Sequence, residues 1–114
     1  MPHEPSGPRM TLPTQLVLRA FLEEPTEELY GLELCARAQL ASGTIHPILA
    51  RLESVGWLVS RWEEADPHEQ GRPRRRYYRL SPDGVVSARA ALARATAGRN
   101  ALGALRPGLA GGAG

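Results

Sequence analysis

The sequence has a single cysteine, no lysine and no long apolar run. One cysteine, Cys35, excludes an intramolecular disulfide, and its place within an apolar helical pattern favours a buried thiol over a redox switch. The longest apolar stretches fall far short of the roughly 20 residues that a membrane-spanning helix needs. Residues 1–9 also lack the apolar core of a secretory signal, so we expect a cytoplasmic protein that does not associate with membranes.

Patterns that carry catalysis or metal binding are missing as well. The chain has three histidines, and no cysteine or carboxylate pair stands near them at ligand spacing. It contains no nucleophile–base set and no glycine-rich phosphate loop. The sequence therefore argues against an enzyme and predicts neither a metal nor a cofactor.

The basic residues that are present are unevenly placed. The formal net charge is only +2, but all 14 basic residues are arginine. Five of them crowd into eight positions: Arg72, Arg74, Arg75, Arg76 and Arg79. Local charge of this density matters more than the total, although an isolated arginine run is usually a solvated face.

Proline and glycine mark both ends of a single expected domain. Residues 1–10 are predicted to be a disordered arm in which Met10 is an alternative start, and residues 98–114 a flexible tail rich in Gly, Ala and Pro. With 42% hydrophobic residues, the 114-residue chain can form one modest core. We therefore expect the folded domain over residues 11–97.

Two helices are predicted in the first third of the chain. The first covers about residues 12–22, where apolar residues occupy most of the helix circumference. The second is short and covers about residues 30–38. In this second helix we expect Leu32, Leu34 and Cys35, or their neighbours, to be buried.

The third helix is predicted from Ser42, acting as N-cap, to Ser54, with Gly56 closing its C-terminus. Pro47 lacks a backbone donor, which is tolerable near the first turn and so places the helix start close to Ser42 or Thr44. Apolar residues at helical spacing predict one buried stripe: Ile45, Ile48, Leu49, Leu52 and Val55.

A hairpin and a fourth helix are predicted next. Residues 57–63 and 74–80 alternate like strands, and the polar segment 64–73 between them predicts a flexible tip. Neighbouring strand residues face opposite sides, so Tyr78 is expected on the core and Tyr77 outside. Residues 81–83, with sequence Ser-Pro-Asp, are typical of a helix start.

The order helix, helix, helix, hairpin, helix is typical of a winged helix-turn-helix, an α+β fold that is mostly α. In this fold the third helix enters the DNA major groove and the hairpin, or wing, lies beside it. The helix start at residues 42–44 suits a phosphate oxygen, and the arginine cluster falls on the predicted wing. That position favours phosphate or minor-groove contact over a solvated face for the arginines.

At three stretches the chain resembles the PadR-type transcriptional regulators: Tyr30–Leu34, Ser42–Leu58 and Gly71–Gly84. The resemblance covers about residues 12–97 and implies a dimeric repressor, held by its first and last helices, that binds a palindromic operator and is often released by a small molecule. The family commonly has tyrosine before the helix proline, where this chain has His46. The region after Ser81 is short, so the dimer interface is expected to be small or shared more with the first helix.

The candidate DNA contacts combine the second and third helices with the wing: Tyr30, Ser42, Gly43, Thr44, His46, Pro47, Arg51, Arg72, Arg74, Arg75, Arg76 and Tyr77. Thr44 is favoured as a contact because Ser42 already supplies the cap. Tyr30 either binds a phosphate through its hydroxyl or caps the core with its ring. The resemblance implies a dimer interface on the first and last helices, for which we predict Leu16, Val17, Phe21, Val85, Ala88, Leu92 and Ala95.

Two alternatives stay open at this stage. Trp57 and Trp62 either line an effector pocket at the dimer interface, or pack separately in the core and under the hairpin. A winged helix can also serve only protein–protein contact, since the fold alone does not dictate nucleic acid as partner. Steep salt dependence of binding would distinguish a double-stranded DNA partner from a protein partner.

Overall fold

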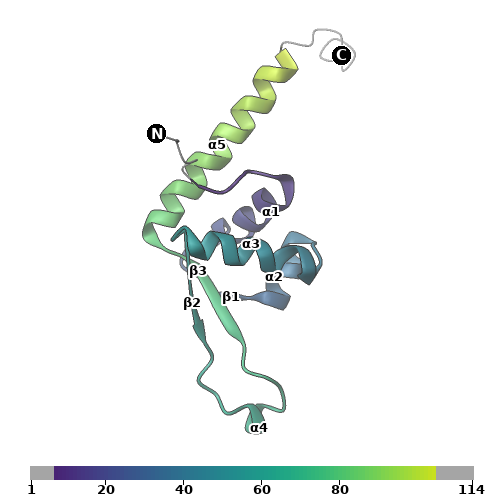
Figure 1. Cartoon of the computed structure of the whole chain (residues 1–114), viewed down its shortest axis with the longest axis vertical. Coiled ribbons are helices and arrows are strands. Elements are labelled where there is room, and N and C mark those ends of the chain that lie inside the picture. Colours follow the sequence, from purple (N-terminus) through teal and green to yellow (C-terminus); the bar gives the residue numbers. More distant parts are fainter. Residues whose placement is uncertain (1–6, 105–114) are drawn as a thin grey trace, which may run out of the picture.

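A computed structural model of the chain describes residues 7–104, and the side chains of residues 7–99. Its elements in chain order are α1 (Leu12–Leu22), β1 (Leu29–Tyr30), α2 (Gly31–Ala38), α3 (Ser42–Ser54), β2 (Leu58–Trp62), α4 (Pro67–Gln70), β3 (Arg76–Leu80) and α5 (Pro82–Ala104). Helices α1, α2 and α3 pack together, the β2–β3 hairpin extends from one side of them, and α5 projects from the other (Figure 1). This is the predicted winged helix-turn-helix.

The core lies between the first three helices and the near end of the sheet. Its largest fully buried side chains are Val17, Leu18, Phe21, Leu29, Leu34, Ile45, Leu49, Leu52 and Leu58. Helix α1 begins where predicted, because the Thr11 hydroxyl accepts a hydrogen bond of 3.3 Å from the Thr14 amide. Its apolar residues surround the helix, which explains how it contacts both α2 and α3.

Two expectations for buried side chains are wrong. Leu32, in the first turn of α2, is 73% exposed, because the core-facing side of that helix is set by Leu34 and Ala38 one turn apart. Val55 is 43% exposed, since it follows the last turn of α3 and leaves the line of the buried stripe. Both positions fit the helical pattern in sequence, but only the packing partner decides which edge of an apolar stripe is covered.

The start of α3 also differs from the prediction. Ala41, not Ser42, is the N-cap, and Ser42 is the first helical residue without a capping role for its side chain. Pro47 therefore lies in the second turn, where its missing N–H leaves the Gly43 carbonyl without an intrahelical donor. Gly43 is exposed, so water can satisfy this carbonyl. As predicted, Gly56 follows the helix end with a positive φ of 83°.

The sheet has the strand order β1-β3-β2, with both pairs antiparallel. Strand β1 was not predicted, because two residues carry no periodicity of their own and it forms only by pairing with Tyr77 and Tyr78. The hairpin tip, predicted only as a flexible segment, contains a helical turn, α4. Asp66 caps this turn by accepting a bond of 3.0 Å from the His68 amide, and Gly71 ends it with a φ of 69°.

Helix α5 starts at the predicted cap, where the Ser81 hydroxyl accepts a bond of 2.9 Å from the Gly84 amide. It continues to Ala104, so residues 98–104, which follow the predicted domain end at residue 97, are helical. The predicted arm is also partly ordered, because Gly7 lies against the Trp57 ring and Met10 packs on the core. The expectations for residues 1–6 and 105–114 lie outside the described residues. None of the helices in the described part of the chain has both the length and the apolar character needed to cross a bilayer.

Candidate nucleic-acid interface

Helix α3 presents its predicted DNA contacts to solvent, five of them in its N-terminal half and Arg51 nearer its end. Buried Ile45, Leu49 and Leu52 anchor one side of the helix in the core, so the opposite side is free. The exposed residues on it include all six α3 candidates: Ser42, Gly43, Thr44, His46, Pro47 and Arg51. The helix therefore offers a small-residue surface with hydroxyl and imidazole groups at its N-terminal end.

A groove of about 600 Å³ separates the start of α2 and α3 from the wing. We call it the wing groove and define it by the residues that line it: Tyr30, Gly31, Leu32, Cys35, Ser42, His46, Trp62, Arg72, Pro73, Arg74, Arg75, Arg76 and Tyr78. It brings together seven of the candidate DNA contacts from three distant parts of the sequence. The other five lie outside it: Gly43, Thr44, Pro47, Arg51 and Tyr77. Of these, Pro47 and Arg51 border a smaller hollow with residues of the N-terminal segment.

The wing groove is cationic. Four of its lining residues are arginines, and none of the described residues that line it is an aspartate or glutamate. Two of these arginines are nevertheless paired with carboxylates that stand outside the groove. The four therefore differ in what they can offer to a ligand.

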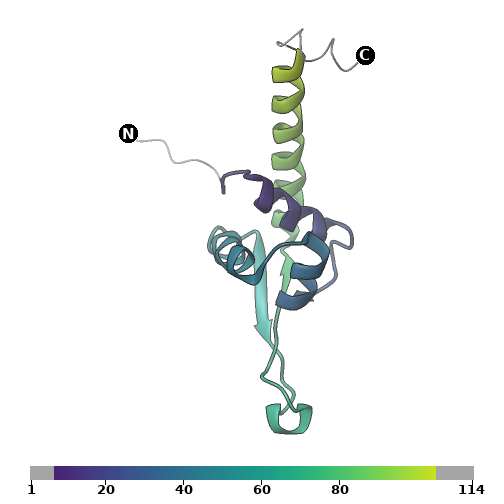
Figure 2. The ribbon, with the colours of Figure 1, turned by 90° about the vertical axis from the view of Figure 1, so that its right-hand side faces the viewer.

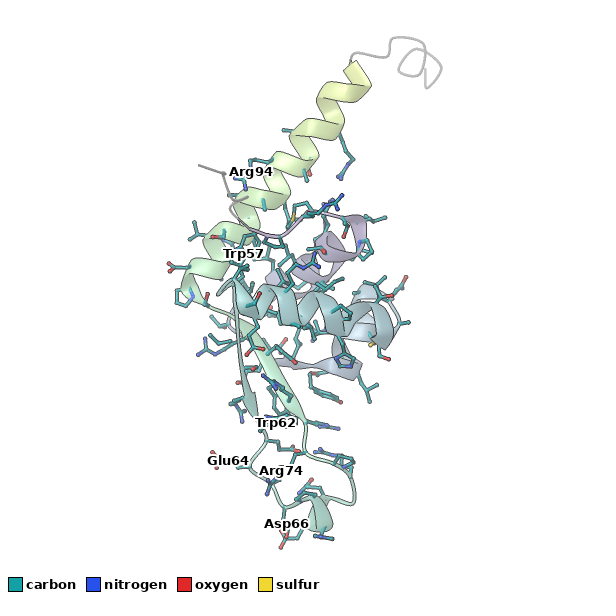
Figure 3. The ribbon with its side chains drawn as sticks, in the orientation of Figure 1. Trp57, Trp62, Glu64, Asp66, Arg74 and Arg94 are labelled. Carbon is teal, nitrogen blue, oxygen red and sulfur yellow. The ribbon has the colours of Figure 1, made fainter. Side chains whose placement is uncertain are left out.

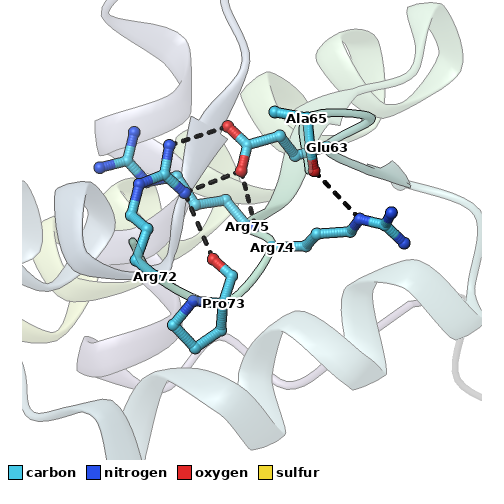
Figure 4. Close-up of polar contacts among 6 residues, drawn as sticks. All are labelled: Glu63, Ala65, Arg72, Pro73, Arg74 and Arg75. Atoms are coloured by element: carbon cyan, nitrogen blue, oxygen red, sulfur yellow. Dashed lines mark hydrogen bonds and ion pairs between the residues drawn. The ribbon is translucent and has the colours of Figure 1, made fainter. Parts of the chain in front are cut away.

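Arg72 is held by a carboxylate of the wing (Figure 4). Its guanidinium donates to both Glu63 oxygens at 2.7 and 2.9 Å, and the Arg75 amide donates to the same carboxylate at 3.2 Å. Mainly because of the Arg72 hydrogen bond, the pKa of Glu63 falls to about 2. This ion pair joins the two sides of the hairpin just before its tip.

Arg76 joins the wing to α3. Its Nη2 lies 3.3 Å from Glu53 of that helix, and its Nε donates to the Ser60 hydroxyl at 3.1 Å. The guanidinium also lies 5.3 Å from the centre of the Trp62 ring. Arg76 therefore sets the position of the wing relative to α3.

Arg74 and Arg75 carry the less engaged guanidinium groups. Arg74 is exposed and donates only from Nε, to the Ala65 carbonyl at 3.1 Å, as Figure 4 shows. The Arg75 guanidinium lies 4.0 Å from the centre of the Tyr30 ring. In the described part of the chain neither forms an ion pair with a carboxylate. Their charge is available to a phosphate.

Tyr30 and Tyr77 form an aromatic pair on the face of the sheet away from the core. Their rings meet edge to face at 5.7 Å, and Arg61 covers Tyr77 at 5.0 Å while pairing with Glu28 at 2.7 Å. The hydrogen bond from Arg61 lowers the pKa of Glu28. The Tyr30 ring thus supports Arg75 and does not cap the core.

Tyr78 lies on the opposite face and packs against the core, as predicted from strand alternation. Burial raises the pKa of its hydroxyl.

Within the single chain described, the two tryptophans line different hollows, so the candidate effector pocket at a dimer interface stays a prediction. Trp57 is 8% exposed and packs in the core beside α5, whereas Trp62 is 57% exposed on the wing. Figure 3 shows them separated along the hairpin. Leu32, Cys35 and Trp62 were missed as groove residues, and Cys35 is half-buried there, not enclosed in the core. The sequence does not reveal that Leu32 and Trp62 are exposed, because each residue fits the apolar pattern of its helix or strand.

Three residues of the predicted dimer interface belong to the chain's own core. Val17, Phe21 and Ala88 are 0%, 1% and 0% exposed, so they have no surface to give to a partner. Leu16, Val85, Leu92 and Ala95 are only partly buried.

No three His, Cys, Asp or Glu side chains among the described residues are grouped to hold a metal ion.

A winged helix with an exposed third helix beside an arginine-lined groove has the architecture of a DNA-binding regulator. A family model described as the transcriptional regulator PadR-like family matches residues 20–90. The chain belongs to this family, whose members are transcriptional regulators and not enzymes, so the resemblance seen in the sequence is confirmed. No curated protein is a significant match to the sequence.

Solved structures are similar in fold. A PadR family transcription regulator from Clostridium difficile R20291 has 20% identity and a TM-score of 0.63, over 81% of this chain and 95% of that one. The smu.1704 protein from Streptococcus mutans UA159 has 24% identity and a TM-score of 0.64, over 86% and 89%. The disulfide-formed AbfR has 26% identity and a TM-score of 0.56 over 70% of this chain, which spans only 49% of the length of AbfR.

Proposed function

We propose that the chain is a cytoplasmic, sequence-specific repressor that binds a palindromic operator in double-stranded DNA as a homodimer. One observation carries the proposal: the exposed N-terminal half of α3 lies directly beside a groove lined by arginines from the wing. A protrusion of small polar residues next to a cationic groove matches a major groove and the phosphate strand that borders it.

In this arrangement the start of α3 reads base edges. Thr44 and His46 are exposed at its N-terminal end, and neither makes a side-chain hydrogen bond within the described part of the chain. Gly43 and Pro47 are small enough to let the helix approach the groove floor, and Arg51 reaches the flanking backbone. Ser42, at the first helical position, offers its backbone N–H to a phosphate.

The wing arginines divide into contacts and supports. Arg74 and Arg75 contact phosphate, with Tyr30 and Tyr77 stacked behind Arg75. Arg72 and Arg76 hold the wing in place through Glu63 and Glu53 while adding positive potential to the groove.

The proposed dimer forms along α5 and the start of α1. Helix α5 projects well beyond the other helices, as Figure 2 shows, and described residues of its distal half border hollows shared with α1, the N-terminal segment and Trp57. Ala95 and Leu12 border one groove there, and Leu12 is 63% exposed. A second copy packed on this side would place two wings on one side of the duplex, which matches a palindromic site.

Release of the operator by a small molecule is the remaining part of the proposal and is supported by the family resemblance. It is tested by a thermal-shift screen, in which compounds that raise Tm are then tested for release of bound operator. Compounds that bind the chain but leave the complex intact would contradict this part alone.

The proposal is tested by comparing variants in a DNA-binding titration over a range of salt concentrations. Replacing Arg74 and Arg75 together by alanine removes two phosphate contacts, so it should lower affinity for all sequences and reduce the salt slope by about 2. Thr44→Ala should weaken operator binding by roughly 5- to 100-fold, with little change for unrelated duplex and none in Tm.

Ser54→Ala is the matched control for Thr44→Ala, because Ser54 is exposed at the other end of the same helix and bonds only to the Arg51 carbonyl. Parent-like operator binding by both the Thr44 and the double arginine variant would reject the assigned interface. Retention of a protein partner with no salt-dependent DNA binding would favour the protein-contact module instead.

A further inference from the structure

Two large apolar side chains line the wing groove and face solvent. Trp62 on β2 is 57% exposed and Leu32 on α2 is 73% exposed. Most of the other lining residues are arginines, tyrosines or small residues. Exposed apolar side chains are unfavourable in water unless a ligand covers them. Because these two lie among arginines, they indicate a ligand in which anionic groups alternate with apolar ones.

A single sugar–phosphate strand of duplex DNA has that chemistry. Its phosphates carry the charge, and the deoxyriboses between them present C–H groups. We propose that the wing groove holds one such strand, with phosphates on Arg74 and Arg75 and deoxyriboses packed on Trp62 and Leu32. This inference rests on the proposed function and adds two apolar contact residues to it.

The indole is held in place to do this. Trp62 pairs with Arg76 across the hairpin, and the Arg76 guanidinium lies 5.3 Å from the centre of its ring. Arg76 is in turn fixed by Glu53 of α3 and Ser60 of β2. The ring is therefore positioned relative to α3 before DNA arrives, which lowers the ordering cost of binding.

The apolar contacts and the arginine contacts differ in their response to salt. Releasing counterions makes phosphate contacts salt-dependent, whereas apolar contact with a sugar releases none. Trp62→Ala should therefore weaken DNA binding roughly five- to tenfold at every salt concentration, with the slope unchanged. Leu32→Ala should act in the same direction with a smaller effect.

Val59→Ala is the matched control. Val59 lies on the same strand and is 39% exposed, but strand alternation puts it on the face opposite Trp62. Its replacement should leave affinity and slope as in the parent.

Fluorescence supplies a second readout, because the chain has only two tryptophans and Trp57 is buried. Titrating the full chain with duplex DNA from the intergenic region beside its own gene should change the tryptophan fluorescence of the parent, because Trp62 contacts the DNA. Trp62→Phe leaves only Trp57 and should show no change, although a labelled duplex reports that it still binds.

The outcomes separate the two levels of the proposal. A salt-independent loss in Trp62→Ala together with a fluorescence change confined to Trp62 supports the strand-in-groove arrangement. Parent-like affinity of Trp62→Ala and unchanged parent emission, while labelled duplex is bound, would overturn it and leave the proposed function standing. A reduced salt slope in Trp62→Ala would also overturn it, since the indole would then act through an arginine. No binding of labelled duplex by the parent would reject the proposed function itself.

Discussion

Gly84 lies where the first turn of α5 crosses the backbone of Trp57. A Cβ added there would collide with the Trp57 carbonyl, which is backbone and cannot swing away. The same carbonyl accepts a hydrogen bond of 2.9 Å from the Ser81 amide, and the Ser81 hydroxyl donates to Gly56 at 2.7 Å. The direction in which α5 leaves the domain is thus fixed by two residues at its start.

Gly84→Ala should lower the free energy of unfolding by about 1–3 kcal/mol, the usual cost of forcing an extra methyl into a packed site. Thermal or urea unfolding measures this. Val86→Ala is the control, because Val86 lies in the same turn of α5 but is 70% exposed, and its effect should stay within about 0.5 kcal/mol. Equal stability of Gly84→Ala and the parent would mean that α5 packs differently here.

At this scale the sequence predicted which residues gather but not what each one does. Arg72, Arg74, Arg75 and Arg76 are identical in sequence terms, yet Glu63 and Glu53 engage two of them and leave two for a ligand. Those carboxylates stand 9 and 23 positions away from their partners. A pairing between distant positions requires the fold, so no local pattern could have assigned it.

Among the elements, the wing contains an ion pair that joins its two sides near the tip, between Arg72 and Glu63. Glu63 accepts two hydrogen bonds from Arg72 and one from the Arg75 amide, joining the end of β2 to the segment before β3. The pKa of Glu63 falls from 4.5 to about 2. A carboxylate with a depressed pKa stabilises the fold fully above its unfolded pKa, and the contribution is lost as the pH falls from about 4.5 toward 2.

We therefore expect the Arg75 amide to stay protected down to about pH 4.5 and to lose protection in a transition near pH 2, followed by NMR or hydrogen exchange. Glu63→Gln should lack this transition. Glu64→Gln, at the exposed neighbouring position, should keep it. A transition that persists in Glu63→Gln would assign it to another group.

The main elements were predictable because each carries its own signal: the apolar residues of α1, the buried stripe of α3, two alternating strands and the Ser-Pro-Asp start of α5. Two short elements were missed for different reasons. Strand β1 has no local pattern and exists only through its pairing with β3. Helix α4 does have a local pattern: Asp66 is its N-cap, Pro67 its first residue and Gly71 its C-cap.

At the scale of the whole molecule, the proposed DNA interface and the proposed dimer contact lie at opposite ends of one domain. The wing and α3, which carry the proposed DNA contacts, form one end, and α5 extends away from the other end (Figure 1). The buried positions of Val17, Phe21 and Ala88 show that residues of the first and last helices mostly hold these helices to each other and to the core. What is left for a partner is the outer edge of α1 and the distal half of α5.

Ala95→Glu should shift the proposed dimer toward monomer and weaken operator binding, because it places a large charged side chain where the proposed contact packs against Ala95. Sedimentation or light scattering gives the mass. Ala90→Glu is the control, since five residues along the helix turn it to a different, exposed face. Parent-like mass for Ala95→Glu, with Tm unchanged, would place the dimer contact elsewhere.

The most direct test of the central claim is a mobility-shift titration of the unmodified protein on the intergenic DNA beside its own gene, with unrelated duplex as competitor, at two salt concentrations. We expect a shifted complex that resists competitor and weakens steeply as salt rises. Absence of a shift at low salt would contradict DNA binding by this interface, and a shift removed equally by any duplex would contradict sequence-specific recognition.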